Sequence, residues 1–223
     1  KKQSSGKLFE SFQETIVNLS KIPLLLKLME LCPLPDLEFE DVVKDIRSAI
    51  LLSVSDINYN TEILTFQIFL ALQCFTNEYL YDQTDVEVDA LKELENLVEN
   101  KLTNGQQPSP TELTCLASYK ALHEFSWFHL LSIPAELKAL QRRQIIEPEE
   151  EKRLRHKIPM LQDIKDSVSR KVREQYEDNP YPRWVNLGLH PSPKSIAATA
   201  KELKLRISNF DINEVSTPQI LIA

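Results

Sequence analysis

Residues 172–184 have the sequence Val172-Arg173-Glu174-Gln175-Tyr176-Glu177-Asp178-Asn179-Pro180-Tyr181-Pro182-Arg183-Trp184. The two prolines lack backbone donors and push the residues before them, Asn179 and Tyr181, out of the helical region. A long polar helical pattern precedes this stretch, so we expect a helix to end near Asp178 and a stiff, extended segment to follow. Tyrosine, arginine and tryptophan side chains bind flat or anionic partners in other proteins. From composition alone, both a domain seam filled by aromatic rings and a binding segment stay open.

The run from Gln175 to Trp184 resembles the Gln-Tyr-Glu-Glu-Asn-Pro-Tyr-Pro-Arg-Trp signature of a family of bacterial proteins. In that family a helical, often tetratricopeptide-bearing region precedes an S-adenosylmethionine-dependent methyltransferase domain. Asp178 replaces a Glu of the signature and keeps its charge. Residues 71–79 are similar to an upstream helix of the family, and residues 218–223 are similar to the first strand of its Rossmann-like sheet. The resemblance covers residues 60–223.

The resemblance implies S-adenosylmethionine as the cofactor of the full-length protein. In the family, the strand runs into a Gly-rich turn that holds the cofactor, and this sequence stops before such a turn. We therefore expect the chain alone to bind no cofactor and to be inactive. Its candidate cofactor-binding or substrate-binding residues are Tyr176, Asn179, Tyr181, Arg183 and Trp184. We interpret their segment as a lid or an acceptor-side wall, with a structural domain seam as the alternative.

Composition predicts a mainly α fold. The 223 residues include only three glycines, which disfavours a sheet-rich fold with many tight turns. We expect a multi-helix bundle over residues 1–158, and then a connecting helix, the extended segment and a short helix over residues 159–217. Residues 218–223 are expected to form the first strand of a truncated Rossmann-like α/β domain that continues beyond Ala223, because a lone strand is unstable. No repeat of tetratricopeptide length is visible.

Charge and cysteine content indicate which partners the protein can bind and in which compartment it lies. The net charge of -7 argues against a general nucleic-acid binder. Residues 151–223 hold 13 Lys and Arg against 9 Asp and Glu, a balance of +4, so residues 1–150 carry -11. The three cysteines are expected to be reduced and buried. With no signal peptide and no long apolar run, we expect a cytoplasmic protein without membrane association.

Apolar spacing and capping signals predict the individual helices. Residues 60–79 are the most apolar and predict the central helix of the bundle. The other predicted helices span residues 8–32 with a break at Pro23, 36–53, 85–102, 109–131, 133–140, 147–157 and 160–178, and a last short helix, capped by Ser192, spans residues 193–205.

Some polar residues need separate interpretation. Glu78 is expected to cap or pair with a neighbouring helix end, because a carboxylate beside apolar turns needs a partner. The acidic face of residues 85–102, which includes Glu87, is expected to lie in solvent. His123 and His129 are six residues apart, which is not the spacing of a zinc-binding pair on one helical face, so we expect no metal site.

Two functions of different classes remain open. The first is the helical substrate-recognition or regulatory part of a methyltransferase, whose methyl acceptor is a protein or a small molecule. The second is a helical protein-protein interaction module without catalysis, which binds a partner or self-associates through an apolar face. A nicotinamide-binding Rossmann protein is a third possibility, since the terminal strand alone suits either cofactor.

Overall fold

The computed structural model describes residues 2–55, 60–155, 157, 166–178, 194–204 and 206. As predicted, these residues are mainly helical, and no strand occurs among them. The chain divides into two units, Lys1–Val185 and Asn186–Ala223. The boundaries predicted at residues 158 and 217 and the strand predicted at 218–223 lie outside the described residues and stay predictions.

The helices of the first unit follow the predicted order. They are α1 (Lys2–Ser20), α2 (Pro23–Leu31), α3 (Leu37–Leu52), α4 (Thr61–Thr76), α5 (Asp85–Thr103), α6 (Pro110–Ala117), α7 (Lys138–Gln141), α8 (Glu147–Arg155) and α9 (Ser167–Asp178). Asp36 accepts from the Phe39 N–H at 2.8 Å and caps α3. Thr84 and Ser109 start α5 and α6 with capping boxes. Local signals therefore fix most helix starts.

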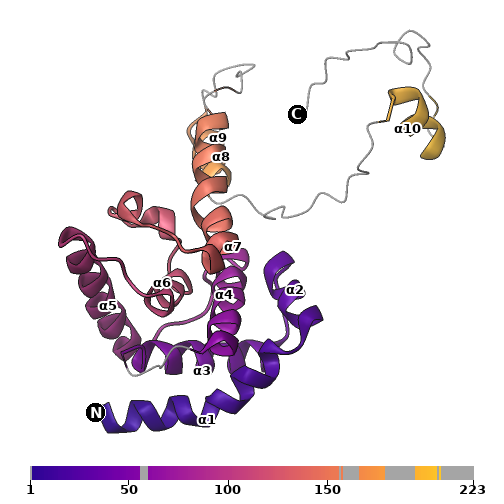
Figure 1. Ribbon diagram of the computed structural model, residues 1–223. Coiled ribbons are helices and arrows are strands. Elements are labelled where there is room, and N and C mark those ends of the chain that lie inside the picture. Colours follow the sequence, from indigo (N-terminus) through magenta and orange to yellow (C-terminus); the bar gives the residue numbers. More distant parts are fainter. Residues whose placement is uncertain are drawn as a thin grey trace. The chain divides into compact units, whose positions relative to one another are not determined.

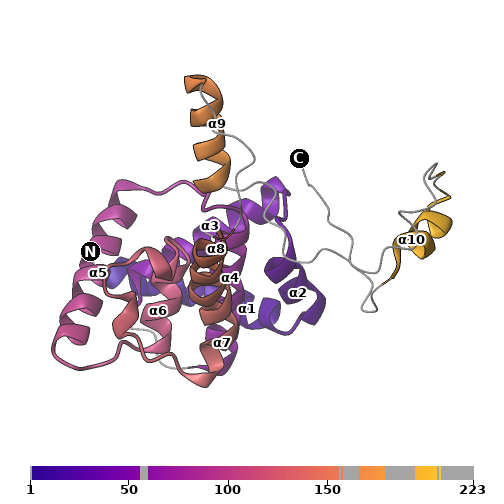
Figure 2. The ribbon, with the colours of Figure 1, turned by 90° about the horizontal axis from the view of Figure 1, so that it is seen from above.

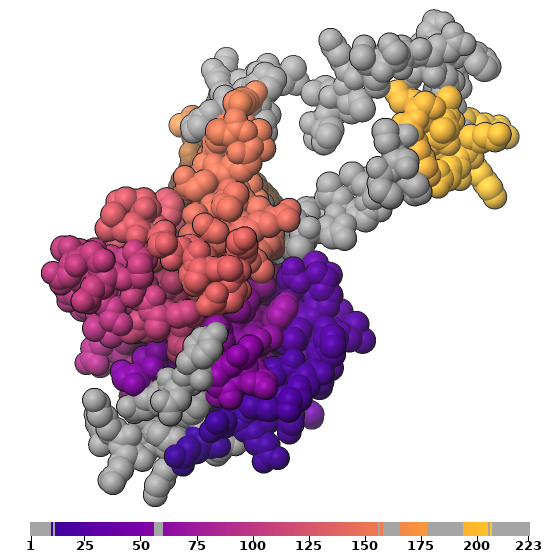
Figure 3. Space-filling view, in the orientation of Figure 1, coloured from indigo at the N-terminus to yellow at the C-terminus, as the bar shows by residue number. Residues whose placement is uncertain are grey.

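Helix α4 is the centre of the first unit, as its apolar sequence predicts. It packs against α1, α2 and α6 (Figures 1 and 2). Most of its side chains are buried, among them Phe66, Leu70 and Leu72. Each such side chain contributes roughly 1.5–3 kcal/mol when it leaves water. On the face seen in Figure 3, the atoms of residues 12–55 lie directly against those of residues 60–155.

The helix predicted over residues 109–131 is wrong in its second half. Helix α6 ends at Ala117, and two 3₁₀ turns, η1 (Leu122–Glu124) and η2 (Phe128–Leu130), follow it. Between these turns Phe125 and Trp127 stack with ring centroids 4.6 Å apart, and both side chains are buried. Residues two apart point to different sides of an α-helix, so this stacked pair is incompatible with a continuous helix.

Two helices predicted as separate elements are joined. After the 3₁₀ turn η3 (Ala135–Leu137), α7 continues through a π-helical turn, η4 (Arg142–Ile146), into α8. The π turn directs the Gln144 side chain into the core, where it is fully buried. Its Oε1 accepts from the Leu122 N–H at 3.1 Å, and its Nε2 donates to the carbonyls of Ala71 and Ala117. One amide therefore ties α4, α6 and η1 together.

The described helix of the second unit is α10 (Ile196–Glu202). Its cap is Ser195, whose Oγ accepts from the Ala198 N–H at 3.1 Å. The prediction of Ser192 as the cap is therefore wrong, and the helix ends before the predicted residue 205. Ser195 stands directly before the first helical residue, so its hydroxyl reaches the free N–H of Ala198 three residues on.

Candidate functional site

The structure places one of the five predicted site residues. Tyr176 lies on α9 with its side chain 62% exposed. Asn179, Tyr181, Arg183 and Trp184 lie outside the described residues, so their proposed role as a lid stays a prediction. No cluster of metal-ligating side chains occurs in the described ranges. His123 and His129 belong to no such group: His123 Nδ1 is 2.9 Å from the Gln144 carbonyl oxygen, and His129 is exposed.

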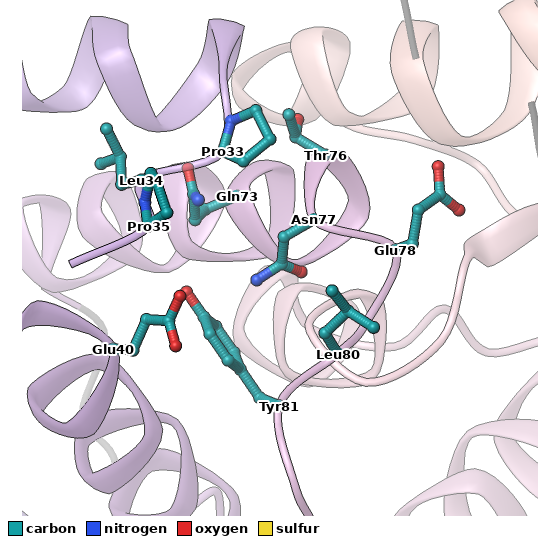
Figure 4. A pocket seen from close by; sticks show the side chains of 10 residues that line it. All are labelled: Pro33, Leu34, Pro35, Glu40, Gln73, Thr76, Asn77, Glu78, Leu80 and Tyr81. Atoms are coloured by element: carbon teal, nitrogen blue, oxygen red, sulfur yellow. The ribbon is translucent and has the colours of Figure 1, made fainter. Parts of the chain in front are cut away.

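A cavity of about 380 Å³ lies at the C-terminal end of α4 (Figure 4). Three segments that are distant in the sequence form it: the link between α2 and α3, the first turn of α3, and the end of α4 with the turn that follows. We call it the α4 pocket. Its lining residues are Pro33, Leu34, Pro35, Glu40, Gln73, Thr76, Asn77, Glu78, Leu80 and Tyr81.

Gln73 builds one wall of the α4 pocket. Its side chain is fully buried. In the amide orientation that satisfies both ends, it donates to the carbonyls of Met29 at 2.8 Å and Cys32 at 3.2 Å, and it accepts from the Leu34 N–H at 3.2 Å. The two prolines beside Leu34 cannot extend a helix. The amide of α4 therefore holds the end of α2 and the proline segment in place.

The floor of the α4 pocket is a strained turn. The predicted end of the central helix at Tyr79 is wrong: α4 ends at Thr76, because Glu78 and Tyr79 have φ angles of 59° and 56°. A non-glycine residue in this left-handed region costs roughly 1–2 kcal/mol. The turn is held by bonds from the Tyr79 N–H to the Cys74 carbonyl at 2.8 Å and from the Tyr79 hydroxyl to the Ala117 carbonyl at 3.2 Å. Such strain concentrates at functional sites.

Two polar atoms of the α4 pocket are buried, the Tyr81 hydroxyl and Asn77 Oδ1. Tyr81 is only 5% exposed, and in Figure 4 its hydroxyl points toward the Glu40 carboxylate. Burial raises the pKa of the Tyr81 phenol and the neighbouring Cys74 and Glu40 add to that rise, while a hydrogen bond with the Gln73 side chain and the charge of Arg47 oppose it. The phenol therefore stays protonated and can donate or accept a hydrogen bond.

A buried arginine lies directly behind the α4 pocket. Arg47 on α3 is 1% exposed, and its Nη2 donates to the carbonyls of Asp82 at 2.7 Å and Tyr81 at 3.4 Å. Its guanidinium lies 4.2 Å from the ring centroid of Tyr119 and 5.5 Å from that of Tyr81. Arg47 thus fixes the backbone of the residue whose hydroxyl lines the pocket.

Glu87 is the anionic partner of this cluster, and its predicted place in solvent is wrong. The side chain is 4% exposed, with Oε1 at 4.0 Å from Arg47 Nη2. Its oxygens accept from the Thr84 N–H and hydroxyl, both at 2.9 Å, and from the Tyr119 hydroxyl at 2.7 Å. Burial alone would raise the Glu87 pKa, but the hydrogen bonds from Tyr119 and Thr84 and the charge of Arg47 hold it below its ordinary value.

The sequence carried signals for both members of the buried pair. Arg47 falls at the core-facing positions of α3, four residues after Val43 and three before Ile50, both of which are buried. Glu87 is the third residue after Thr84, the spacing of a capping box that turns the carboxylate back toward the helix start. The interpretation of residues 85–102 as one acidic solvent face overlooked that spacing.

A groove between α3 and α5 is a second hollow of the first unit. It has a volume of about 570 Å³ and lies between the C-terminal end of α3 and the first three turns of α5. Its floor is apolar, and Asp89 and Glu93 contribute carboxylates to its lining. Val86 and Leu97 remain exposed along it. This groove offers an apolar surface with an acidic rim.

Among the described helices, none combines the length and the apolar character that a membrane span requires. Comparisons of the chain with protein-family models, with curated proteins and with solved structures found no match.

Proposed function

We propose that this chain is the helical, acceptor-binding part of an S-adenosylmethionine-dependent methyltransferase. One observation carries the proposal. The stretch 71–79, which resembles the upstream helix of that family, supplies Gln73, Thr76, Asn77 and Glu78 to the α4 pocket. A stretch that resembles the family therefore coincides with a pocket that contains a strained turn and several polar side chains. Residues 179–184 serve as a lid or an acceptor-side wall in this proposal.

In this proposal the α4 pocket takes the methyl acceptor rather than the cofactor. S-adenosylmethionine carries a carboxylate on its methionine part, and the described residues that line the pocket include no Lys, Arg or His to pair with it. The Glu40 carboxylate, which lies beside the Tyr81 hydroxyl, would face it instead (Figure 4). Methyl transfer needs donor and acceptor held at reacting distance with water excluded. The described residues supply apolar walls and fixed polar atoms for holding an acceptor.

The native gene product provides the test. We expect its intact mass to exceed the 25.8 kDa of this chain by one domain, and we expect it to bind S-adenosylmethionine in calorimetry. The 223-residue chain, titrated in parallel, should give no heat of binding. A native product of 25.8 kDa that binds no cofactor would overturn the proposal. In the native product, Arg183→Ala should weaken cofactor or acceptor binding, whereas a domain seam would lose only thermal stability.

A helical interaction module without catalysis is the second candidate. The groove between α3 and α5 favours it, because an apolar floor with carboxylates at its rim suits a basic amphipathic helix. Exposed Leu97 lies in this groove. Concentration-dependent self-association in sedimentation experiments, abolished by Leu97→Glu and unaffected by the exposed Leu154→Glu on α8, would support this function over methyl transfer.

A further inference from the structure

Helix α9 carries a stripe of apolar side chains in solvent. Val168, Val172 and Tyr176 follow one another at steps of four residues, so their side chains share one face of the helix. Their exposed fractions are 67%, 45% and 62%. A row of large apolar side chains in water is characteristic of a surface that binds another protein segment.

The stripe points away from the helix to which α9 is paired. Glu177 of α9 forms an ion pair with Arg155 at the end of α8. At 3.6 residues per turn, Glu177 lies about 140° around the helix from Val172. The ion pair with α8 therefore uses one face of α9 and leaves the apolar stripe on the opposite face.

The groove between α3 and α5 has the length and the apolar lining that this stripe requires. Its α5 side runs from Val86 to Leu97, which is about 17 Å at 1.5 Å per residue. The stripe from Val168 to Tyr176 spans about 12 Å on the same rule. Val86 and Leu97 are exposed along the groove, so the groove can take all three side chains of the stripe against apolar surface.

The charges beside the groove and beside the stripe are opposite. The described lining of the groove includes the carboxylates of Asp89 and Glu93 and no Lys, Arg or His. Lys171 lies three residues after Val168 and borders the stripe, and its side chain is exposed. A cation at the edge of an apolar helix face therefore meets carboxylates at the rim of an apolar groove. We infer that the groove between α3 and α5 of one copy binds α9 of a second copy.

The ion pair between α8 and α9 favours a second copy over α9 of the same copy. Within one copy, Arg155 holds α9 beside α8, whereas the groove is formed by α3 and α5, which pack on each other. Two copies that each place α9 in the groove of the other form a closed dimer with two identical contacts. This exchange buries twice the apolar area of a single contact.

This inference names the partner of the groove in the interaction-module function, and it rests on that function rather than on methyl transfer. The two can fail separately. Self-association that Leu97→Glu abolishes, but that substitutions on α9 leave unchanged, would keep the interaction module and overturn α9 as the bound segment.

Sedimentation equilibrium of the 223-residue chain measures the contact. We expect the average mass to rise with concentration from 25.8 kDa toward twice that value. Val172→Glu places a charge in the middle of the stripe and should weaken the association about tenfold or more. Val172 is exposed, so this variant should fold like the wild type. A wild-type chain that stays at 25.8 kDa up to about 1 mM would overturn the inference.

A charge exchange identifies the two surfaces. Asp89→Lys in the groove and Lys171→Glu on α9 should each weaken the dimer about tenfold, because each places like charges across the contact. The double variant Asp89→Lys/Lys171→Glu restores opposite charges and should bring the dissociation constant back to within about threefold of the wild-type value. Glu99→Lys on α5 and Arg170→Glu on α9 change exposed residues outside the groove and the stripe, and these matched controls should dimerise like the wild type. A double variant as weak as the two single effects combined would refute the pairing of α9 with this groove.

Discussion

The Tyr119 hydroxyl donates a hydrogen bond of 2.7 Å to Glu87 Oε1 across 32 residues of sequence. The bond joins the first turn of α5 to the segment that follows α6. The Tyr119 ring also lies against the Arg47 guanidinium, at 4.2 Å from its centroid. One phenol thus supports an anion through its hydroxyl and a cation through its ring, and both charges are buried.

Tyr119→Phe should lower the free energy of unfolding by about 1.5–3 kcal/mol, the range for a hydrogen bond to a charged group. The ring and its contact with Arg47 remain, but Glu87 loses a donor in a buried place. Urea unfolding at pH 7 measures the change. Tyr176→Phe on exposed α9 is the control and should leave stability unchanged. Equal stabilities of the two variants would contradict the role assigned to Tyr119.

The ionisation of Glu87 should make the free energy of unfolding fall at acidic pH. Its pKa is lowered from the ordinary value of 4.5, so its contribution is fully present above pH 4.5 and is lost as the pH falls toward its folded-state pKa. Glu87→Gln removes this titration. The stability difference between wild type and Glu87→Gln, measured by urea unfolding, should be constant near neutrality and shrink below pH 4.5. A stability difference that stays constant down to pH 3 would contradict the stabilising role of the Glu87 carboxylate.

The helix starts were predictable because short-range chemistry decides them. Pro23, Asp36, Asn60 and the Ser109 capping box mark starts that the structure confirms. The end of α6 was not predictable from spacing, since the aromatic residues after Ala117 keep an approximately helical pattern. The stacking of Phe125 on Trp127, which a continuous helix would not allow, depends on the packed core and not on local spacing.

The α4 pocket was hidden from sequence reasoning for a related reason. Its acceptors come from α3, from the end of α4 and from the following turn, and no spacing rule joins Glu40 to Tyr81. The two residues with left-handed backbone angles are Glu78 and Tyr79, and neither is a glycine or asparagine, the residue types that predict such a turn. The predicted site residues 179, 181, 183 and 184 rest on a resemblance, and they lie outside the described residues.

Gln144→Leu should destabilise the chain by about 1–3 kcal/mol for the buried groups it leaves without partners. The Leu122 N–H and the Ala117 carbonyl both bond to its amide. The exposed Gln106→Leu is the control, and thermal unfolding followed by circular dichroism is the measurement. If the melting temperature of Gln144→Leu falls no more than that of the control, the π turn does not depend on this amide.

The three cysteines should differ in reactivity toward Ellman's reagent. Cys74 and Cys115 are buried, and burial raises the pKa of the Cys74 thiol to about 12 and raises that of Cys115 as well. Only thiolates react, so the native chain should expose one reactive thiol, Cys32, and urea should release all three. Cys32→Ser should abolish the native reaction. Rapid native reaction of a second thiol would contradict the burial of α4 and α6.

Arg47 and Glu87 should be energetically coupled. Arg47→Met leaves the Glu87 carboxylate buried without its cation and should cost about 3–5 kcal/mol. In Glu87→Gln the capping box keeps an acceptor, while the charge that Arg47 faces is removed. The double variant Arg47→Met/Glu87→Gln should therefore be more stable than the sum of the single effects predicts, by about 0.5–3 kcal/mol. Urea unfolding of all four proteins at pH 7 gives the coupling. Strict additivity would mean that the 4.0 Å approach of the two charges contributes nothing, and that Arg47 acts only through its bonds to the carbonyls of Tyr81 and Asp82.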